Sequence, residues 1–155
     1  MNTMPMLTGH HRQLHRFAGR WAGEETIAAT PWIAGGEAEA RVEMHVGLGG
    51  FYVLQNYRQL RDGEERLSAH ALLTWNAEAD CVAMFWFDSI GHVPETPATG
   101  EWHGDTLVLT RSSRRGVARH TYELIGDNEY RVRLDFKTGE PESWMPVSSA
   151  VMRRV

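Results

Sequence analysis

The sequence predicts an all-β protein: an antiparallel up-and-down β-barrel of about ten strands with a short N-terminal helix closing one end. Three observations lead to this prediction. From residue 20 onward, apolar and polar residues alternate with a period of two in short segments. Turn signals separate these segments, and the short connections favour antiparallel neighbours. Because ten strands in an open sheet would expose two long edges, we expect closure into a barrel.

The 155 residues are expected to form a single domain, since domains commonly have about 100–150 residues. No composition shift, repeat or low-complexity segment divides residues 1–155. Within this domain we expect the helix at about residues 8–18 and the barrel at about residues 20–153.

The helix has recognisable start and stop signals. Thr8 can cap its first turn, and Gly19 is suited to end it. Leu14 and Phe17 fall on one face at helical spacing, which gives the helix an apolar side to pack against the barrel.

The strands follow from alternation and turn residues. Between residues 37 and 46, charged residues and His alternate with Ala, Val and Met, which indicates one wet and one apolar face. Gly-Gly, Asp-Gly and Gly-Asp pairs mark several turns. The longest irregular stretch is a proline-containing loop at about residues 91–97. Ten strands are expected at residues 20–30, 37–48, 51–61, 64–75, 81–89, 99–103, 106–112, 117–125, 129–137 and 143–153.

A Gly-Arg-Trp-Ala-Gly segment at residues 19–23 opens the first strand. We expect Trp21 to close the floor of the barrel by packing on Leu14 and Phe17, because a side chain of this size buries a large area.

Composition bounds the classes of partner. The net charge of -4 argues against a nucleic-acid-binding protein, which would present a basic face. The densest basic cluster is interpreted as a solvated hairpin tip; it comprises Arg111, Arg114, Arg115 and Arg119.

The single Cys81 rules out an intrachain disulfide and fits a reducing compartment. No apolar run approaches the ~20 residues of a membrane span. Met1 to Thr8 lack the pattern of a signal peptide. We therefore expect a cytoplasmic protein without a membrane partner.

His120 and Tyr122 share a side of their strand with apolar residues, so both are expected to face inward. An interior imidazole needs partners for its ring nitrogens. Two readings of His120 stay open: a hydrogen-bonded core residue, or a ligand donor or general base with a tuned pKa.

Trp86 and Asp88 share a side with Val82 and Met84, which places Asp88 at the inner end or rim of its strand. A buried carboxylate needs hydrogen bonds or a cation. Asp88 is therefore expected either to hold the following loop through backbone N–H groups or to anchor a ligand at the barrel mouth.

Three further residues are candidates for the interior. Glu25 shares its side with Trp21. Tyr57 and His70 lie on strands whose two faces are both mixed, so the sequence leaves their direction open.

His11 and His15 stand four residues apart on the helix, a spacing that suits a metal. There is no obvious third ligand, so we interpret them as a solvated face and expect no metal. The sequence also lacks a phosphate-binding loop, a dinucleotide-binding fingerprint and a Gly-x-Ser-x-Gly elbow.

Four motifs together resemble the bacterial DUF1579 family. They are His-x-x-Leu-x-x-Phe-Ala-Gly-x-Trp-x-Gly at residues 11–23, Leu-Gly-Gly-Phe at 48–51, Trp-Phe-Asp-Ser at 86–89 and Gly-x-Trp-x-Gly-Asp-x-Leu at 100–107. The resemblance covers nearly the whole chain. It implies a lipocalin-like (calycin) barrel of about ten strands, and it implies no reaction because the family's function is unassigned.

The opening Gly19-x-Trp21-x-Gly23 is more distantly similar to that of nitrobindins, which are haem-binding ten-stranded barrels. Their haem histidine lies in the C-terminal part of the barrel, whereas this chain has no histidine after His120. We accordingly expect no cofactor.

Three functions remain open. The first is a binding module that holds a small, largely apolar molecule, gripped by Trp86, Tyr57 and Tyr122 and oriented by polar groups such as His120, Asp88, His70 and Glu25. The second is an enzyme acting on an apolar small molecule with His120 or Asp88 as general acid or base. The third is a ligand-free barrel with an external interaction face, for instance a homodimer contact.

Overall fold

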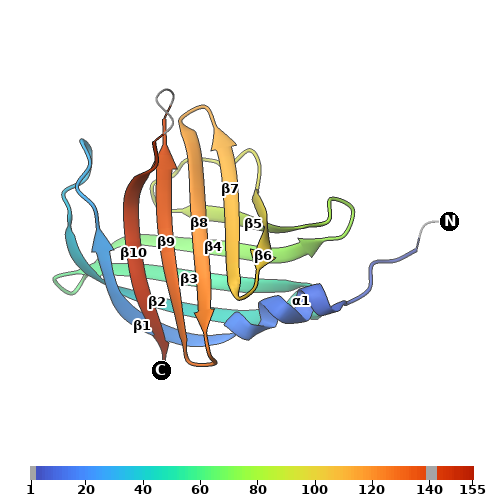
Figure 1. Ribbon diagram of the computed structural model, residues 1–155. Coiled ribbons are helices and arrows are strands. Elements are labelled where there is room, and N and C mark those ends of the chain that lie inside the picture. Colours follow the sequence, from blue (N-terminus) through green and yellow to red (C-terminus); the bar gives the residue numbers. More distant parts are fainter. Residues whose placement is uncertain (1–2, 139–142) are drawn as a thin grey trace.

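The computed structural model describes residues 3–138 and 143–155 and confirms the predicted fold (Figure 1). Ten antiparallel strands close into a barrel in which β1 pairs with both β2 and β10. Within the described residues, no helix is long and apolar enough to cross a membrane. The strands are β1 Gly19–Ile27, β2 Gly36–Gly47, β3 Tyr52–Arg61, β4 Glu64–Asn76, β5 Cys81–Asp88, β6 Ala98–His103, β7 Thr106–Ser113, β8 Gly116–Ile125, β9 Glu129–Lys137 and β10 Met145–Arg154.

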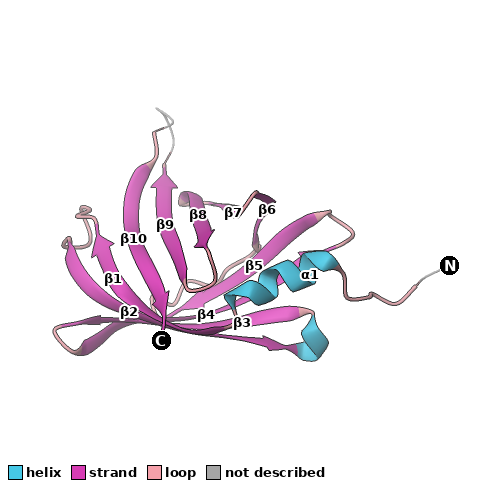
Figure 2. Ribbon diagram, turned by 60° about the horizontal axis from the view of Figure 1, so that its bottom comes forward, coloured by secondary structure: helices cyan, strands magenta, loops and turns pink. Residues whose placement is uncertain are grey.

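The predicted N-terminal helix is present in two parts, α1 Gly9–Leu14 and the 3-10 turn η1 His15–Phe17. The Thr8 hydroxyl accepts the backbone N–H of His10, and the His11 ring accepts that of Thr8 at 3.0 Å. These two bonds satisfy donors at the helix start. The helix then lies across one end of the barrel (Figure 2).

The barrel is flattened rather than round. In Figure 1, β2, β3 and β4 cross behind β7 to β10 at a steep angle, as in orthogonally packed sheets. The burial pattern of β2 follows the predicted alternation, whereas β5 buries three consecutive residues, Val82 to Met84. The inner positions of β2 and β4 carry small side chains; they include Ala38, Ala40, Ala69 and Ala71.

The barrel wall is weakest between β5 and β7. Strand β6 pairs with β5 over only three residue pairs, from Val82–Gly100 to Met84–Ala98. Beyond Met84, β5 runs on to Asp88 with no β6 partner, and residues 89–97 form a loop that includes the one predicted at 91–97. One end of the barrel is therefore less completely walled than the helix end.

Trp21 fills the floor, as predicted. Its side chain is 1% exposed, and its indole N–H donates to the Phe17 carbonyl at 2.9 Å. The Tyr130 ring meets it edge-on at 4.8 Å, and the Arg154 guanidinium lies over its ring at 4.2 Å. Leu14 belongs to the same buried cluster.

The glycines on either side of Trp21 have distinct roles. Gly19 has a φ of 138°, which favours glycine. A Cβ at Gly23 would overlap the backbone carbonyl of Val151 on β10. The absence of a side chain at Gly23 therefore lets the first strand approach the last.

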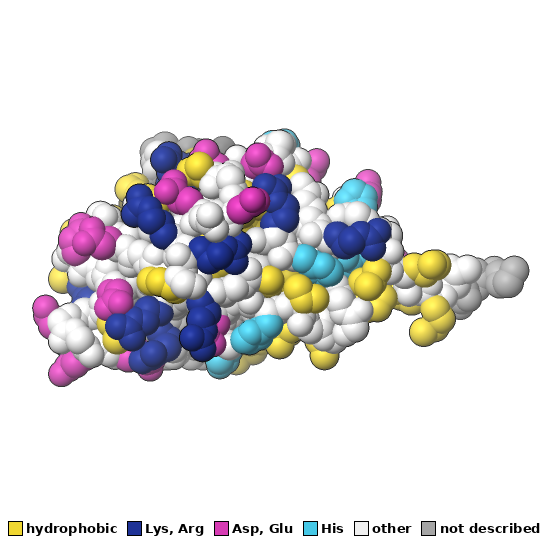
Figure 3. All heavy atoms as spheres, turned by 90° about the horizontal axis from the view of Figure 1, so that it is seen from below, with side chains coloured by type: hydrophobic (Ala, Val, Ile, Leu, Met, Phe, Trp, Pro, Cys, Tyr) yellow, Lys and Arg dark blue, Asp and Glu magenta, His cyan; other side chains and the backbone are white. Residues whose placement is uncertain are grey.

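The prediction that His11 and His15 form a solvated face is wrong. His11 is 5% exposed and meets the Phe51 ring edge-on, and the His15 ring donates to the Gly50 carbonyl at 2.8 Å. The cause is the turn after β2, the η2 segment Leu48–Gly50, which packs against the helix. Figure 3 shows histidine and hydrophobic side chains gathered on this underside, away from the more charged part of the surface.

We predict that Gly23→Ala lowers the free energy of unfolding by about 1–3 kcal/mol, because the methyl group forces β1 away from β10. Urea denaturation followed by circular dichroism measures the change. Gly9→Ala is the matched control, since nothing lies within 4 Å of a Cβ at that position. Equal losses in both variants would show that the β1–β10 contact is not tight.

Candidate ligand-binding site

A cavity of about 750 Å³ occupies the barrel interior and reaches the end opposite the helix. All strands except β6 contribute to its lining. Its inner walls are mostly aromatic and aliphatic, whereas arginines and aspartates border its mouth. The aromatic lining comprises Tyr57, Trp86, His120, Tyr122, Tyr130 and Phe136.

Six of the seven candidate residues border this cavity: Glu25, Tyr57, Trp86, Asp88, His120 and Tyr122. The seventh, His70, is exposed on the outer face of β4, where its Nδ1 donates to Asn56 Oδ1 at 2.5 Å. The inner face of β4 belongs instead to Ala69, Ala71 and Leu73. His70 therefore lies outside the cavity lining.

Glu25 is the most deeply buried acid of the cavity, at 6% exposure. The Tyr57 hydroxyl donates to it at 2.6 Å, and Gln59 Nε2 donates at 2.9 Å. Burial, followed by the charge of Glu25, raises the pKa of Tyr57, so this hydroxyl keeps its proton and stays a donor. Sequence reasoning missed Gln59, although it shares the inner side of β3 with Tyr57.

Asp88 makes the loop contact that the sequence offered as the first of its two roles; the second, a ligand anchor, stays a prediction. Its Oδ2 accepts the Trp86 indole N–H at 2.8 Å, and its Oδ1 accepts the backbone N–H of Ile90 at 3.0 Å. The carboxylate thus fixes the start of the 89–97 loop and holds the Trp86 ring against the cavity.

His120 faces the cavity without a hydrogen-bond partner in the described part of the chain. Burial, and secondarily the charge of Arg111, lowers its pKa to about 4, so the ring is neutral at physiological pH. The Trp86 ring lies 5.6 Å away at 41°. The environment does not fit a hydrogen-bonded core histidine, because neither ring nitrogen makes a hydrogen bond within the described residues.

Gln55 and Tyr122 lie further inside. Gln55 is 4% exposed and borders the cavity, and its Oε1 has no partner within the described residues. The Tyr122 hydroxyl contacts Met84 Sδ at 3.7 Å, and burial raises the pKa of Tyr122 to about 12. Sequence reasoning missed Gln55 as well; its place two residues before Tyr57 on the inner side of β3 was the available signal.

The interpretation of the basic cluster as a solvated tip fits Arg114 and Arg115, which are exposed at the hairpin turn, and is wrong for Arg111, which is half-buried. Arg111 borders the cavity mouth from β7, and Arg115 borders it from the turn. Arg111 points inward because it continues the inner row of Leu107 and Leu109 on β7. On the outer face, Arg119 donates to Asp135 at 3.2 Å.

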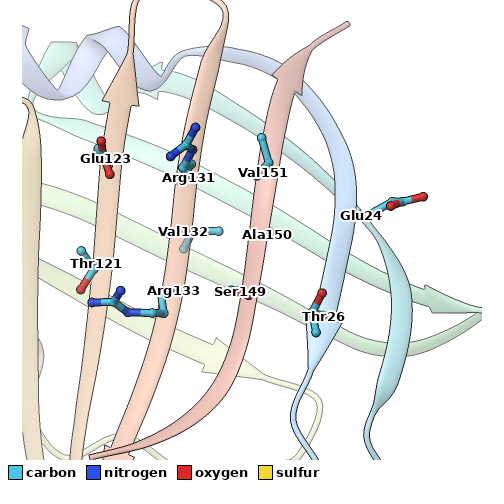
Figure 4. A pocket seen from close by; sticks show the side chains of 10 residues that line it. All are labelled: Glu24, Thr26, Thr121, Glu123, Arg131, Val132, Arg133, Ser149, Ala150 and Val151. Carbon is cyan, nitrogen blue, oxygen red and sulfur yellow. The ribbon is translucent and has the colours of Figure 1, made fainter.

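A second hollow of about 440 Å³ lies on the outside of β8, β9, β10 and β1 (Figure 4). Its side chains project from four strands without converging on a common point. Acids and bases of opposite charge share it, among them Glu24, Glu123, Arg131 and Arg133. This arrangement is typical of a solvated sheet surface, and the interior cavity is the stronger candidate.

Metal-ligand geometry is lacking in the part of the chain that the structure describes: no three His, Cys, Asp or Glu side chains gather closely enough to hold an ion.

Residues 7–154 match the sequence model of a family described as "Protein of unknown function (DUF1579)". The chain belongs to the DUF1579 family. None of the curated proteins matches this DUF1579 protein.

Solved structures share its fold at low identity. Rv2717c from M. tuberculosis aligns with a TM-score of 0.71 and 19% identity, covering 97% of this chain and 99% of that one. The S-type phycobiliprotein lyase CPES from Guillardia theta aligns with a TM-score of 0.68 and 10% identity, covering 96% and 93%. A DUF3598 protein of unknown function from Nostoc punctiforme aligns with a TM-score of 0.62 and 11% identity, covering 98% of this chain and 51% of that one.

We predict that the stability of this DUF1579 protein falls as the pH drops from about 6.5 to about 4. The pKa of His120 is about 4 in the folded protein and 6.5 in an ordinary environment, so only the unfolded chain binds the proton within this window. The effect on the free energy of unfolding is at most about 3 kcal/mol. Water that enters the cavity makes this effect on stability smaller. Urea denaturation at a series of pH values measures the free energy of unfolding.

His120→Gln removes this component of the pH dependence, and His103→Gln, at an exposed position on β6, retains it. His11, whose pKa is also lowered by burial, is common to both variants. Identical pH profiles in the wild type and both variants would contradict the assignment.

We also predict that Tyr57→Phe destabilises the protein by about 1–3 kcal/mol at neutral pH, because Glu25 then keeps only Gln59 as a buried donor. Tyr52→Phe on the same strand is the control, with an expected change within about 0.5 kcal/mol. Thermal unfolding compares the two. A loss no larger for Tyr57 than for Tyr52 would mean that the Tyr57–Glu25 bond contributes nothing.

Proposed function

We propose that this protein binds a small, largely apolar molecule in the interior of its barrel. The observation that carries the proposal is the cavity of about 750 Å³ with aromatic walls and few polar groups. Small-molecule sites commonly have about 300–1,000 Å³, apolar walls and a few placed polar side chains. Tyr57, Trp86 and Tyr122 supply wall area, while Glu25, Asp88 and His120 supply orientation.

The fold neighbours are consistent with this proposal. One of them is a phycobiliprotein lyase of the same barrel fold at 10% identity. Its activity belongs to that protein. The lyase supports the proposal only as an example of this barrel fold with a function other than scaffolding.

The enzyme alternative is less well supported. Proton transfer is most efficient when the pKa of the catalytic group is near the working pH, and a pKa of about 4 makes His120 a weak base at pH 7. Both oxygens of Asp88 already accept hydrogen bonds from Trp86 and Ile90. A ligand-free interaction barrel is also less well supported, since it would be expected to have a filled interior.

A cytoplasmic location, the absence of nucleic-acid partners and a homodimer contact stay predictions from composition and sequence. None of them enters the argument for the cavity.

The test is a titration with Nile red, a neutral apolar dye whose emission rises in an apolar site. We predict binding by the wild type and at least about tenfold weaker binding by Ala118→Trp, because Ala118 borders the cavity and an indole there fills it.

Thr110→Trp is the matched control. Thr110 lies on the neighbouring strand β7 and is exposed, so the same side chain is added outside the barrel. Circular dichroism checks that both variants fold. Binding that is lost equally in both variants, or in neither, would place the dye outside the cavity and overturn the proposal.

A further inference from the structure

The charges of the cavity are distributed unevenly along its length. Arg111 is half-buried on the inner side of β7 and borders the mouth. Its guanidinium has no hydrogen bond or ion pair within the described residues. Arg115, exposed at the turn of the same hairpin, also borders the mouth, and its side chain has no partner within the described residues. A half-buried cation such as Arg111 is unfavourable without a counter-charge, so an anionic group bound here gains attraction at little added cost.

The other cations of the mouth are engaged. Arg61 donates to the Ala34 carbonyl at 3.1 Å, and Arg66 pairs with Glu64 at 3.1 Å. Arg111 and Arg115 are thus the available positive charges. Asp62 and Asp88 border the same end. Asp62 is exposed at a turn, where water screens its charge, and the oxygens of Asp88 already accept two N–H groups.

The inner part of the cavity has the opposite preference. Gln55 presents a buried carbonyl oxygen without a partner, and the Glu25 carboxylate lies between this oxygen and the mouth. Both groups accept hydrogen bonds and repel an anion. A hydroxyl or N–H group would satisfy the Gln55 oxygen, whose unpaired burial is otherwise unfavourable.

We propose that the occupant is an elongated apolar molecule with an anionic group, such as a carboxylate, bound by Arg111 and Arg115 and a hydroxyl or N–H donor that reaches Gln55. This inference rests on the proposed function and adds the polarity and orientation of the ligand. The middle of the molecule contacts the rings of Tyr57, Trp86 and neutral His120.

The barrel register sets the length of this molecule. Arg111 pairs with Ala118, and Leu107 pairs with Tyr122, whose hydroxyl lies near the Gln55 side chain. Four residues of strand separate the two levels, or about 13 Å. An extended chain of about a dozen carbons spans this distance.

The test compares four probes of one chain length by isothermal titration calorimetry at pH 7.5, below their micelle concentrations. They are dodecanol, dodecanoic acid, ω-hydroxydodecanoic acid and dodecylamine. We expect dodecanoate to bind about tenfold or more tightly than dodecanol, and the ω-hydroxy acid to bind several-fold more tightly again. Dodecylamine is expected to bind no better than dodecanol.

Three variants assign these preferences to residues. Arg111→Gln should remove the preference for the acid over dodecanol. Arg114→Gln, at an exposed position on the same hairpin outside the cavity lining, should keep it. Gln55→Leu should remove only the gain from the ω-hydroxyl, and because it deletes an unpaired buried oxygen it should not destabilise the fold.

The outcomes separate this inference from the proposed function. If Nile red and dodecanol bind in the cavity but dodecanoate binds no better than dodecanol, or dodecylamine binds best, the polarity is wrong while the cavity remains a binding site. If Arg111→Gln keeps the acid preference, the anion lies elsewhere and the inference is overturned. If no probe binds, the proposed function fails as well.

Discussion

Closure of the first strand against the last is the constraint on which the rest of the barrel depends. Strand β1 pairs with β10 from Trp21–Arg154 to Ile27–Ser148, and the missing side chain at Gly23 lets the two backbones meet. Trp21 then fills the floor beneath Tyr130, with its N–H on the Phe17 carbonyl and Arg154 over its ring. Because these large side chains occupy the helix end, the free volume of the barrel is displaced toward the other end. The Gly-x-Trp-x-Gly segment thus determines both the closure and the side on which the cavity opens.

The size of the cavity follows from the residues opposite the aromatic wall. The inner positions of β2 and β4 include Ala40 and Ala71, whose small side chains cannot reach across to β8 and β9. Protein interiors are close-packed, so small residues facing large ones usually interdigitate. Here the large rings beside these alanines, Tyr57 on β3 and Trp86 on β5, are held at the same wall by Glu25 and Asp88. Hydrogen bonds that fix two rings in place keep the space between the walls open.

The fold and most of the residues that line the cavity could be predicted from the sequence, because side chains along a strand point alternately to the two faces of the sheet. The alternation within their own strands is enough to place His120, Tyr122 and Trp86 on the inner face, whichever strands pair with them. It was insufficient for His70, because both faces of β4 are mixed, and only the pairing with β3 brings His70 onto Asn56. Arg111 was predicted to be solvated because it belongs to a cluster of charged residues. Its alternation with Leu107 and Leu109, which point inward on the same strand, indicated the opposite direction. Whether Gln55 Oε1 finds a partner depends on atoms from distant strands, which no local pattern records.

The unpaired groups of the interior contrast with the outer surface. On the outer surface, Arg41 pairs with Glu39 and Arg58 with Glu65, each at 2.8 Å. These charged groups have a counter-charge even though water could solvate them. Inside the cavity, Gln55 Oε1 is buried without a partner among the described residues, and the half-buried His120 ring makes no hydrogen bond there. An unpaired buried oxygen such as that of Gln55 reduces the stability of the empty barrel by about 1–3 kcal/mol. A molecule that satisfies these groups binds only the folded state, so its binding free energy adds directly to stability. An empty barrel of reduced stability and an occupied barrel of normal stability are therefore two consequences of the same arrangement of side chains.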